Sequence, residues 1–478
     1  MFVDRTADLE EMERRWGAEP QFQLLWGRRR VGKSALIRHF AEGRDAIVYQ
    51  AVSGTITDQL GLLTRRILAW RPDPLLQAAP LASWEQAFAY LEGLGRERQS
   101  ARQPLLLALD EFQHLAATDH ALVSRLSDFY EVVKHERLPL FIVISGSSIS
   151  FFEKQVAVGG VFGRRTFGGL LSPLDYQDAA AFFPGWESAD RLRAWAILGG
   201  IPYYLEQFDP DRSLAWNIRE RMLRRNQVLY NEAELMLRDE LTEPAVYHSI
   251  LAAIAEGATT NGEIASASGV AAPSLPVYLR KLELLHLVGR GVPFGVDPRK
   301  SKKGTWTITD GYLAFWHRFI RPNAVDLEAG RVDQVWRDEV RPRLDEFVSK
   351  PAFERACRSF VRAQMGRVAG LPERGAVGAW WGTTPIVVGG ARRLERLEAD
   401  VVAGSTKRIA LVGEVKWSDR VDRHALGQLR RVAAAMPGTD ASTRLALFSR
   451  GGFDDRLRAI AAAEDMLLFD VDDLYASD

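Results

Sequence analysis

A short stretch near the amino terminus has the residue types and spacing needed to bind a phosphate. Gly27–Ser34 reads Gly-Arg-Arg-Arg-Val-Gly-Lys-Ser and fits the P-loop pattern G-x-x-x-x-G-K-[ST]. Gly27 and Gly32 let the main chain curl so that several N–H groups point at one phosphate. We expect Lys33 to contact the β- and γ-phosphates. Ser34 should bind Mg²⁺ and begin a helix whose dipole favours anions.

The sequence around this stretch supports ATP with Mg²⁺ as the ligand. Phe22–Trp26 is mostly apolar and predicts a strand, whereas Ala35–Phe40 continues as a helix. The alternative is a glycine-rich turn with an incidental lysine. The loop residues expected to surround the nucleotide are Gly27, Arg28, Arg29, Arg30, Val31, Gly32, Lys33, Ser34 and Ala35.

A second motif supplies acids. Leu105–Glu111 reads Leu-Leu-Leu-Ala-Leu-Asp-Glu, an apolar run that ends in two carboxylates and is typical of a Walker B strand. We expect Asp110 to bind the Mg²⁺ shell and Glu111 to orient and activate water. Alone, the pattern fits an acidic loop at a strand end equally well. Its position downstream of a P-loop lysine favours the nucleotide site.

Two further polar positions could complete this site. Ser147, in Ile144–Ser148, could sense the γ-phosphate, although Ser147 or Ser148 could equally cap a helix. Arg164 could neutralise charge in the transition state, or could be a surface or helix-capping arginine.

Strands and helices must alternate to position these residues. The predicted strands are Phe22–Trp26, Ile47–Val52, Pro104–Leu109, Leu140–Ser145 and Arg165–Leu170. The predicted helices are Ser34–Ala41, Thr57–Trp70, Ser83–Arg98 and Leu122–His135. Such alternation predicts βαβ units and a parallel sheet covered on both faces.

These motifs together resemble the archaeal-type ATPase family, in the STAND-like branch of the AAA+ P-loop NTPases. The matching segments are GRRRVGKS, LLLALDEFQ, ISGSS, Leu198–Leu205 (LGGIPYYL) and Phe2–Arg5 with Leu9. The resemblance implies that Arg5 lies on the adenine side and that Pro202 belongs to a small helical lid near adenine. Without it, Gly199 and Gly200 would be a helix C-cap and Pro202 a helix stop.

The middle of the chain predicts a winged helix-turn-helix. Helices at Pro244–Glu256, Gly262–Ala267 and Pro273–His286 precede a hairpin, Leu287–Pro293 with Gly304–Thr309. Phosphate contacts could come from Ser274, Tyr278, Arg280, Lys281, Arg299, Lys300, Lys302 and Lys303. The alternative is a structural brace with a solvated hairpin tip. Trp306–Trp316 resembles the aromatic helix that follows the wing in the same family.

The tail contains a second set of residues that could do chemistry. Glu414 and Lys416 lie two apart on a predicted strand, Ile409–Lys416, and therefore share a face. Asp400 precedes them across a short turn, and Glu354 lies on a leading helix. The two carboxylates could bind Mg²⁺ or Mn²⁺, with Glu354 as a further ligand, while Lys416 steadies an attacking hydroxide.

This order resembles the PD-(D/E)xK restriction-endonuclease-like fold, which forms the carboxy-terminal domain of many archaeal-type ATPases. The resemblance includes a following helix with Gln428, and it departs from the pattern in having Ala399, not proline, before Asp400. The alternative is a surface salt-bridge cluster on an ordinary α/β domain.

Composition limits the compartment and the partners. Lys plus Arg and Asp plus Glu both total 62, so any DNA contact must use a local basic patch. Cys357 is the single cysteine, which suits a reducing compartment. No apolar run reaches the roughly 18 residues of a membrane span. We expect a soluble cytoplasmic protein that contacts DNA and forms a homo-oligomer or binds a regulatory protein.

The fold class expected from these patterns is multidomain α/β. It comprises a P-loop AAA+-type parallel sheet (1–172), a helical lid (173–238), a winged helix (239–320), a helical connector (321–350) and a restriction-endonuclease-like α/β domain (351–478). The expected function is ATP hydrolysis coupled to a metal-dependent DNA nuclease. The alternative is an ATP-dependent regulatory switch with a non-cleaving tail. A helicase-like motor is disfavoured because the sequence offers no second motor domain.

Overall fold

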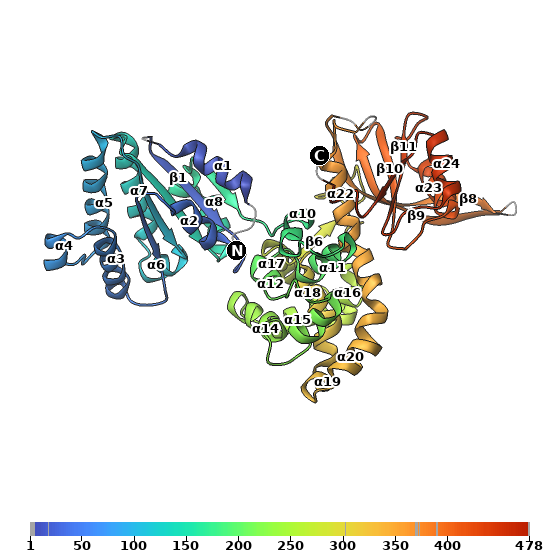
Figure 1. Ribbon diagram of the computed structural model, residues 1–478, viewed down its shortest axis with the longest axis horizontal. Helices are drawn as coiled ribbons and strands as arrows, with labels where there is room; N and C mark the ends of the chain where they lie inside the picture. Colours follow the sequence, from blue (N-terminus) through green and yellow to red (C-terminus); the bar gives the residue numbers. More distant parts are fainter. Residues whose placement is uncertain are drawn as a thin grey trace. The chain divides into compact units, whose positions relative to one another are not determined.

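The computed structural model describes residues 5–17, 19–301, 303–368, 371, 373–388 and 391–476, apart from the side chains of 384–388 and 391–393. The chain forms two compact units (Figure 1). The first comprises Met1–Pro173 with Ile201–Tyr203, and the second comprises Leu174–Gly200 with Tyr204–Asp478. No helix of the described chain is both long enough and apolar enough to cross a lipid bilayer.

A parallel sheet forms the centre of the first unit. Its strands are β1 (Gln21–Trp26), β2 (Ala46–Gln50), β3 (Leu105–Asp110), β4 (Leu140–Gly146) and β5 (Phe167–Leu170). Their order is β2-β3-β4-β1-β5, and every neighbouring pair is parallel. The parallel sheet predicted from the sequence is confirmed. Because β4 lies between β1 and β3, its carboxyl end separates the P-loop from the Walker B acids.

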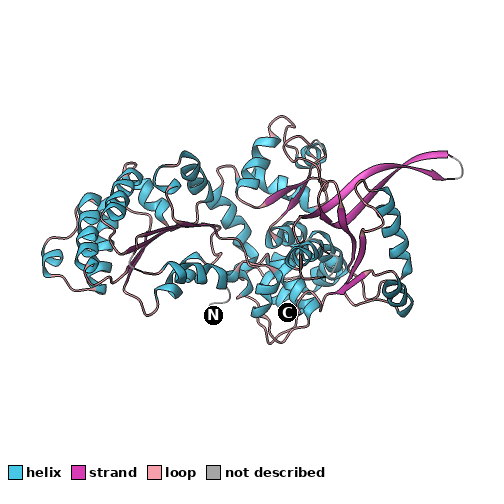
Figure 2. Ribbon diagram, turned by 90° about the horizontal axis from the view of Figure 1, so that it is seen from above, coloured by secondary structure: helices cyan, strands magenta, loops and turns pink. Residues whose placement is uncertain are grey.

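Helices cover both faces of this sheet (Figure 2). They are α1 (Thr6–Arg15), α2 (Lys33–Ala41), α3 (Ile56–Trp70), α4 (Pro74–Ala78), α5 (Trp84–Gln99), α6 (Phe112–Thr118), α7 (Leu122–His135), α8 (Ile149–Val158) and α9 (Gly160–Gly163). Coverage on both faces explains why β3 and β4 are buried throughout and read as continuous apolar runs.

The second unit begins with helices and a hairpin. The helices are α10 (Tyr176–Ala179), α11 (Ser188–Leu198), α13 (Leu214–Asn217), α14 (Val228–Glu240), α15 (Pro244–Ala255), α16 (Asn261–Ser268) and α17 (Leu275–Leu284). The short α12 (Pro202–Leu205) begins in the first unit. Strands β6 (Val288–Gly291) and β7 (Thr305–Ile308) pair antiparallel. Three helices followed by a hairpin therefore form where the sequence predicts them.

A mixed sheet forms the tail. The helices that precede this sheet are α18 (Gly311–Phe315), α19 (Ala324–Glu328), α20 (Val332–Val335), α21 (Leu344–Phe347) and α22 (Glu354–Ala363). The strands are β8 (Ala376–Val388), β9 (Ala391–Gly404), β10 (Ile409–Lys416), β11 (Arg444–Ser449) and β12 (Leu467–Asp470). Helix α23 (Arg423–Ala435) follows β10, and α24 (Asp455–Ala463) follows β11. The order is β12-β11-β10-β9-β8. Strands β8, β9 and β10 are antiparallel, whereas β10, β11 and β12 are parallel. Strands β8 and β9 extend as a long ribbon (Figure 2).

The lid segment shares a hydrophobic core with the tail. Tyr176 and Leu192 pack in one cluster with Phe353 and Phe360. The Tyr176 hydroxyl also donates to the carbonyl of Leu474 at 3.1 Å. The segments expected to form separate lid, winged-helix, connector and tail domains therefore lie in one compact unit. Contacts this distant in sequence leave no local pattern.

Candidate functional site

The loop between β1 and α2 has the conformation of a phosphate cradle. Gly32 caps α2 in the left-handed region at φ 102°, which favours glycine. A Cβ on Gly27 would lie 2.6 Å from the carbonyl oxygen of Leu171, so only glycine fits there. The buried Lys33 donates from Nζ to the carbonyls of Gly27 and Arg28, both at 2.9 Å. The loop thus holds its lysine at the mouth of α2.

Other expected nucleotide residues gather around this loop. Arg5 donates from Nη2 to the carbonyl of Val31 at 2.9 Å. The Arg30 guanidinium lies 4.1 Å from the ring centre of Tyr203, and Pro202 Cγ lies 3.8 Å from where a Cβ of Gly32 would be. The loop arginines divide by environment. Arg28 is buried and Arg29 is exposed, as is Ala35 at the start of α2. Phe2, Val3 and Asp4 of the amino-terminal box lie outside the described residues.

Asp110, the last residue of β3, is hydrogen-bonded to β4 and to the first turn of α2. Its Oδ2 accepts a hydrogen bond from the Ser34 hydroxyl, and its Oδ1 accepts from the Ser145 hydroxyl, both at 2.5 Å. Oδ1 also accepts from the Glu111 N–H at 3.0 Å. The hydroxyl and the carboxylate expected to bind Mg²⁺ are therefore already adjacent. Such a pair, with phosphate oxygens and water, is the ligand set that Mg²⁺ prefers.

Glu111 is held by the tip of β4. Its Oε2 accepts from Ser147 N–H at 3.1 Å, from the Ser147 hydroxyl at 2.6 Å and from Gln113 Nε2 at 2.5 Å. Burial alone would raise the pKa of Glu111. The bonds from Ser147 and Gln113 and the charge of Lys33 outweigh that effect, so the net pKa is lowered. Glu111 is thus kept ionised, as a base must be.

Ser147 lies beside Glu111 just after β4, and Gln113, which the sequence did not indicate, contacts both residues. Ser148, not Ser147, is the N-cap residue of α8, and its side chain makes no capping bond. A Cβ on Gly146 would lie 2.1 Å from Gln113 Oε1, so glycine at the strand tip admits the glutamine. The feature of the sequence that could have indicated Gln113 is its position two residues after Glu111.

The structure does not bring Arg164 to the phosphate loop. Arg164 precedes β5, and its neighbour Thr166 donates from its N–H to the carbonyl of Phe22 at the start of β1. The residue therefore lies toward the amino-terminal edge of the sheet, opposite the P-loop. Its guanidinium pairs with Glu131 of α7, and both side chains are half exposed. Within this chain, Arg164 acts as a surface arginine.

The tail residues meet at one face of the mixed sheet. Asp400 on β9 accepts a hydrogen bond at Oδ2 from the Val415 N–H of β10 at 2.9 Å. Lys416 donates from Nζ to Glu414 Oε1 at 2.6 Å. Glu354 lies on α22. Arg358 of the same helix donates a hydrogen bond to the Glu354 carboxylate at 3.4 Å and another to the main-chain carbonyl of Asp400 at 2.7 Å. The four residues expected from the sequence are therefore neighbours.

The carboxylates of this cluster are poorly stabilised as anions. Burial, reinforced by the charge of Asp400, raises the pKa of Glu354 to about 7. Burial also raises the pKa of Asp400, and burial with the Asp400 charge raises that of Glu414. In the described chain, Glu354 Oε1 and Glu414 Oε2 are buried and receive no hydrogen bond. A proton or a cation would relieve this arrangement.

The sequence did not indicate two neighbours of this cluster, Lys350 and Glu398. Lys350 Nζ lies 3.5 Å from Glu354 and 3.0 Å from Glu398. Glu398 precedes Asp400 by two positions on β9, so strand alternation was the missed signal. Within the described ranges, no three His, Cys, Asp or Glu side chains form a ready-made metal cage. The carboxylates would have to rearrange to enclose an ion.

Comparisons with known proteins agree with the first site. Residues 2–208 match a family described as an ATPase domain predominantly from Archaea, and residues 316–427 match archaeal and bacterial proteins of unknown function. The first match, together with the parallel sheet and the P-loop of the first unit, supports a P-loop ATPase fold for that unit. An uncharacterized protein of Methanocaldococcus jannaschii is 29% identical over 431 residues, covering 88% of this chain and 89% of its own.

Two solved structures are also similar. A Walker-type ATPase of Pyrococcus abyssi is 20% identical with a TM-score of 0.47, covering 66% of this chain and 96% of its own. The Aeropyrum pernix ORC2 protein is 16% identical with a TM-score of 0.40, covering 69% of this chain and 96% of its own.

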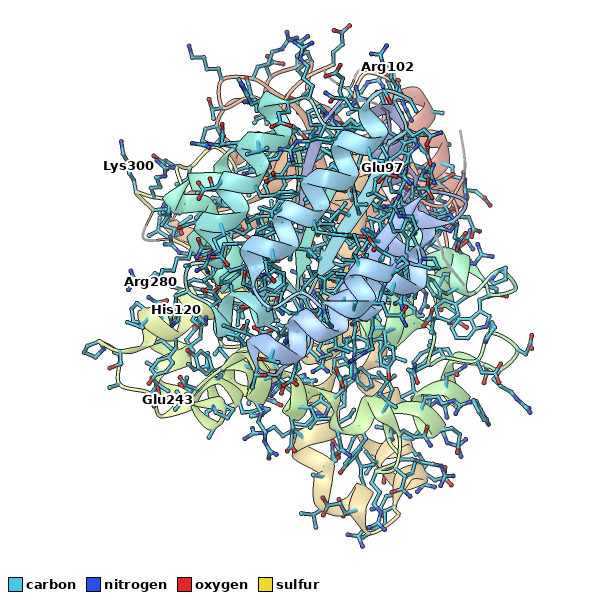
Figure 3. The ribbon with its side chains drawn as sticks, turned by 90° about the vertical axis from the view of Figure 1, so that its left-hand side faces the viewer. Glu97, Arg102, His120, Glu243, Arg280 and Lys300 are labelled. Atoms are coloured by element: carbon cyan, nitrogen blue, oxygen red, sulfur yellow. The ribbon has the colours of Figure 1, made fainter. Side chains whose placement is uncertain are left out.

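Basic side chains lie on the segment formed by α15, α16, α17, β6 and β7, here called the helix–hairpin module. Arg280 of α17 and Lys300 of the hairpin tip point outward (Figure 3). Arg299 and Lys303 are exposed as well, whereas Lys302 lies outside the described residues. Of the other phosphate-contact candidates, Tyr278 donates its hydroxyl to Glu243 at 3.2 Å. The module therefore presents cations from both its third helix and its hairpin.

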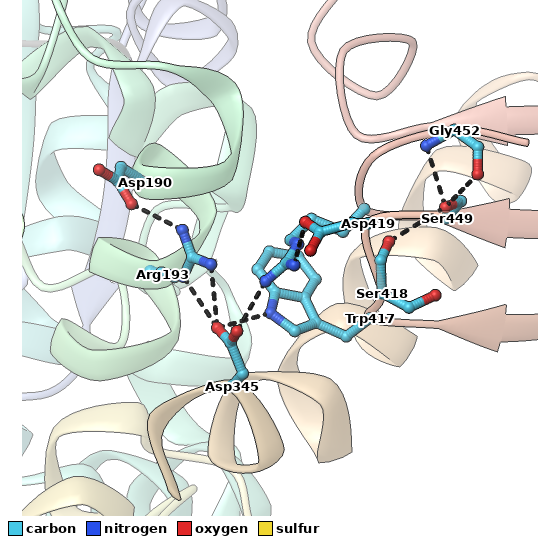
Figure 4. A network of polar contacts seen from close by, with 9 residues as sticks. Asp190, Arg193, Asp345, Trp417, Ser418, Asp419, Ser449 and Gly452 are labelled. Atoms are coloured by element: carbon cyan, nitrogen blue, oxygen red, sulfur yellow. Dashed lines mark hydrogen bonds and ion pairs between the residues drawn. The ribbon is translucent and has the colours of Figure 1, made fainter. Parts of the chain in front are cut away.

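A polar network fixes the segment just after Lys416. Asp345 accepts hydrogen bonds from Arg193 of α11, from Trp417 Nε1 at 2.9 Å and from Arg450 at 2.6 Å (Figure 4). Burial opposes ionisation of Asp345, but the Trp417 bond and the two arginines lower its pKa overall. One carboxylate of the connector thus joins α11 to the strand that bears Glu414 and Lys416.

Proposed function

We propose that this chain is a cytoplasmic, Mg²⁺-dependent ATPase that acts on DNA. The observation that carries the proposal is the meeting of four side chains at the carboxyl ends of β3 and β4 and the start of α2: Ser34, Asp110, Glu111 and Ser147. Ser34 and Asp110 would hold Mg²⁺, and Lys33 would neutralise the phosphates. Glu111 would take a proton from the attacking water while the γ-phosphate bond to ADP breaks.

Two substitutions test these roles. Lys33→Ala should abolish nucleotide binding, whereas Glu111→Gln should retain binding and lose hydrolysis. Glu131→Gln, a glutamate on α7 with a half-exposed side chain, is the matched control and should hydrolyse ATP normally. Unchanged nucleotide affinity in a folded Lys33→Ala protein would defeat the assignment.

We further propose that the tail hydrolyses DNA phosphodiester bonds with Mg²⁺ or Mn²⁺. Support comes from Glu354, Asp400 and Glu414, whose burial and raised pKa values favour a bound cation. Water would lose a proton to solvent, and the resulting hydroxide, stabilised by Lys416, would attack phosphorus. The P–O bond to the leaving oxygen would break as that oxygen takes up a proton from solvent. Glu354, Asp400 and Glu414 together would supply the ligands after rearranging around the ion.

Cleavage assays separate this nuclease from the alternative, a non-cleaving ATP-dependent switch. Asp400→Asn and Lys416→Ala should lose metal-dependent cleavage of plasmid and single-stranded DNA while keeping ATP hydrolysis. Asp419→Asn, at an exposed acid beyond Trp417, is the control. If no metal supports cleavage that these variants lose, the switch function replaces the nuclease.

We propose that the helix–hairpin module is a winged helix that contacts DNA phosphates. Its support is the outward placement of Arg280, Arg299, Lys300 and Lys303. Neutralising the three described hairpin cations should reduce the slope of log K against log salt by about three units, roughly one for each lost phosphate contact. An unchanged slope would make the module a structural brace.

A further inference from the structure

A cavity of about 790 Å³ lies within the second unit, beside the candidate nuclease residues. Three elements form its walls: the helix–hairpin module, the connector that ends at Pro351, and strands β8 and β9. Glu354 and Asp400 both line it. The cavity therefore places the carboxylates of the tail and the hairpin module around one space.

The walls are fastened to each other, so the cavity has a defined shape. The Phe294 N–H, just after β6, donates to the carbonyl of Ala379 on β8 at 2.7 Å. A Cβ on Gly291 of β6 would lie 3.6 Å from the Trp381 ring. Strand β8 is the edge strand of the tail sheet, and the hairpin thus covers part of its free edge.

Indole rings line this cavity. Trp380, Trp381 and Trp417 all face it, and each is only partly buried. Trp417 is already occupied, because the guanidiniums of Arg193 and Arg450 lie 5.3 and 5.6 Å from its ring centre. Trp380 packs on the core beneath the sheet. Trp381 is therefore the indole best placed to receive a flat ligand.

Trp381 lies near the acids of β9 because of its position in the sheet. Trp381 pairs directly with Glu398 across the strands, and Glu398 is two residues from Asp400. Two residues along a strand span about 7 Å. That length is comparable to the distance between a base and the phosphate of the same nucleotide. A base stacked on Trp381 would thus bring its phosphate toward Asp400 and Glu354.

The charged side chains that line the cavity are compatible with a bound phosphate if Glu354 and Asp400 hold a cation. Glu398 is paired with Lys350 and Asp345 with two arginines, so these carboxylates are neutralised. Arg396 of β9 is exposed on the cavity wall. Glu354 and Asp400 line the cavity together. Lys350 and Arg358 lie within 3.5 Å of the Glu354 carboxylate, but Glu354 Oε1 receives no hydrogen bond, and a divalent ion would sit between these acids and a phosphate.

We propose that this cavity binds an unpaired DNA strand, with a base stacked on Trp381 and the adjoining phosphate at Glu354 and Asp400. The volume suits one or two nucleotides, because cavities of roughly 300–1,000 Å³ enclose ligands of that size. In a duplex each base is stacked between its neighbours and has no free face for Trp381, whereas a base of an unpaired strand can stack on the indole. The inference deepens the proposed nuclease and rests on it for the identity of the phosphate site.

Binding, measured separately from cleavage, tests the inference. Fluorescence anisotropy of the full chain is followed with an oligo(dT) of about 12 nucleotides, a blunt duplex, and the same duplex with a single-stranded overhang. Each probe is used in EDTA and with Ca²⁺ in place of Mg²⁺. The variants are Trp381→Ala, Trp381→Phe, Arg396→Gln and, as a matched tryptophan outside the second unit, Trp70→Ala. Thermal unfolding and ATP hydrolysis verify that each variant is folded.

We expect oligo(dT) and the overhang to bind more tightly than the blunt duplex. Trp381→Ala should weaken that binding about fivefold or more, the effect of losing one stacked base, and Trp381→Phe should retain most of it. Arg396→Gln should lower the salt slope by about one unit, and Trp70→Ala should change nothing. Equal affinity for blunt duplex, or an unchanged Trp381→Ala, would overturn the inference.

The same experiment distinguishes this inference from the nuclease proposal. Strand binding that depends on Trp381, without cleavage in any metal, would keep the cavity as a single-strand site and remove the nuclease. Metal-dependent cleavage of duplex that ignores Trp381 would keep the nuclease and remove the strand site.

Discussion

The two candidate sites treat their carboxylates in opposite ways. At the ATPase site, Glu111 accepts three hydrogen bonds and lies near Lys33, so its pKa falls despite burial. In the tail, Glu354 and Asp400 are buried near each other, and the pKa of each rises. The first site stabilises an anion with its own donors. The second leaves anionic charge for a bound cation to neutralise.

This difference indicates what each site needs before it can react. Under the proposed functions, the ATPase site would need only nucleotide and Mg²⁺, because its base is ionised and oriented. The tail site would need a metal to complete its electrostatics, so metal binding should also change its stability. Four predictions can break or sharpen this contrast.

The largest effect is expected at Glu111. Glu111→Gln keeps the shape of the side chain and removes the base, so ATP hydrolysis should fall by about a hundredfold or more. Nucleotide affinity and the metal response of the tail should both persist. Steady-state hydrolysis and equilibrium nucleotide binding measure the two halves of this prediction. Retention of near-normal turnover would mean that another group activates the water.

The second prediction concerns the pH dependence of the tail. The folded pKa of Glu354, about 7, exceeds its usual value of 4.5, so the native state holds a proton that the unfolded chain releases. The stabilisation is complete below about pH 4.5 and is lost as pH rises through 7. A shift of this size corresponds to at most about 3 kcal/mol. Without metal, the tail should therefore become less stable from pH 5 to 8, as unfolding monitored with EDTA would show.

Divalent metal should reverse that loss of stability, and Glu354→Gln should make the loss smaller, because Asp400 and Glu414 still titrate with raised pKa values. Mn²⁺ or Mg²⁺ at pH 8 is expected to raise the unfolding temperature of the wild type and to have less effect on Glu354→Gln. Glu346→Gln, an exposed glutamate of the connector, is the control. A metal response that is identical in wild type and Glu354→Gln would contradict a cation at this site.

The sequence predicted the ATPase site more completely than the tail site. The apolar strands β3 and β4 and the P-loop spacing indicated that Ser34, Asp110 and Ser147 would lie near one another, and the structure brings them together around Asp110 and Glu111. The sequence did not predict that Gln113 contacts Glu111. Glu111 adopts a left-handed conformation, at φ 56°, and this turn directs the chain into α6. Local turns of this kind are poorly marked by residue type.

In the tail, the paired strands were predictable but their extent and surroundings were not. Strand β8 continues past Gly382 and Pro385, residues that usually end a strand, so the sequence indicated only its first part. Lys350 reaches Glu354 and Glu398 from the connector, which no spacing within the tail reveals. The cavity itself exists only because segments distant in sequence meet.

A smaller effect is expected from Ser147. Ser147→Ala removes the 2.6 Å hydroxyl bond to Glu111 but keeps the 3.1 Å main-chain bond. The pKa of Glu111 should rise, so the acid limb of the pH–rate profile should shift to higher pH. The loss near neutral pH should be about tenfold, since one hydrogen bond to a charged group contributes roughly 1.5–3 kcal/mol. Ser148→Ala is the matched control, because its side chain makes no capping bond. A rate loss without a shift of the profile would mean that Ser147 acts on the nucleotide and not on Glu111.

The smallest effect is expected at Asp345, which joins regions but touches neither set of proposed reacting groups. Its lowered pKa means that the ionised form stabilises the folded chain above the usual value of 3.8, and that this contribution is lost as pH falls through the folded pKa. At neutral pH, Asp345→Asn keeps the shape but loses the charge facing Arg193 and Arg450. Stability should fall by about 1–2 kcal/mol, and ATP hydrolysis should be unchanged.

Because Trp417 follows Lys416 directly, loosening Trp417 should also reduce metal-dependent cleavage several-fold. Asp419→Asn, which removes only the second partner of Arg450, should change cleavage less. If both variants behave alike, the network serves stability alone, and the tail site is positioned by its own sheet.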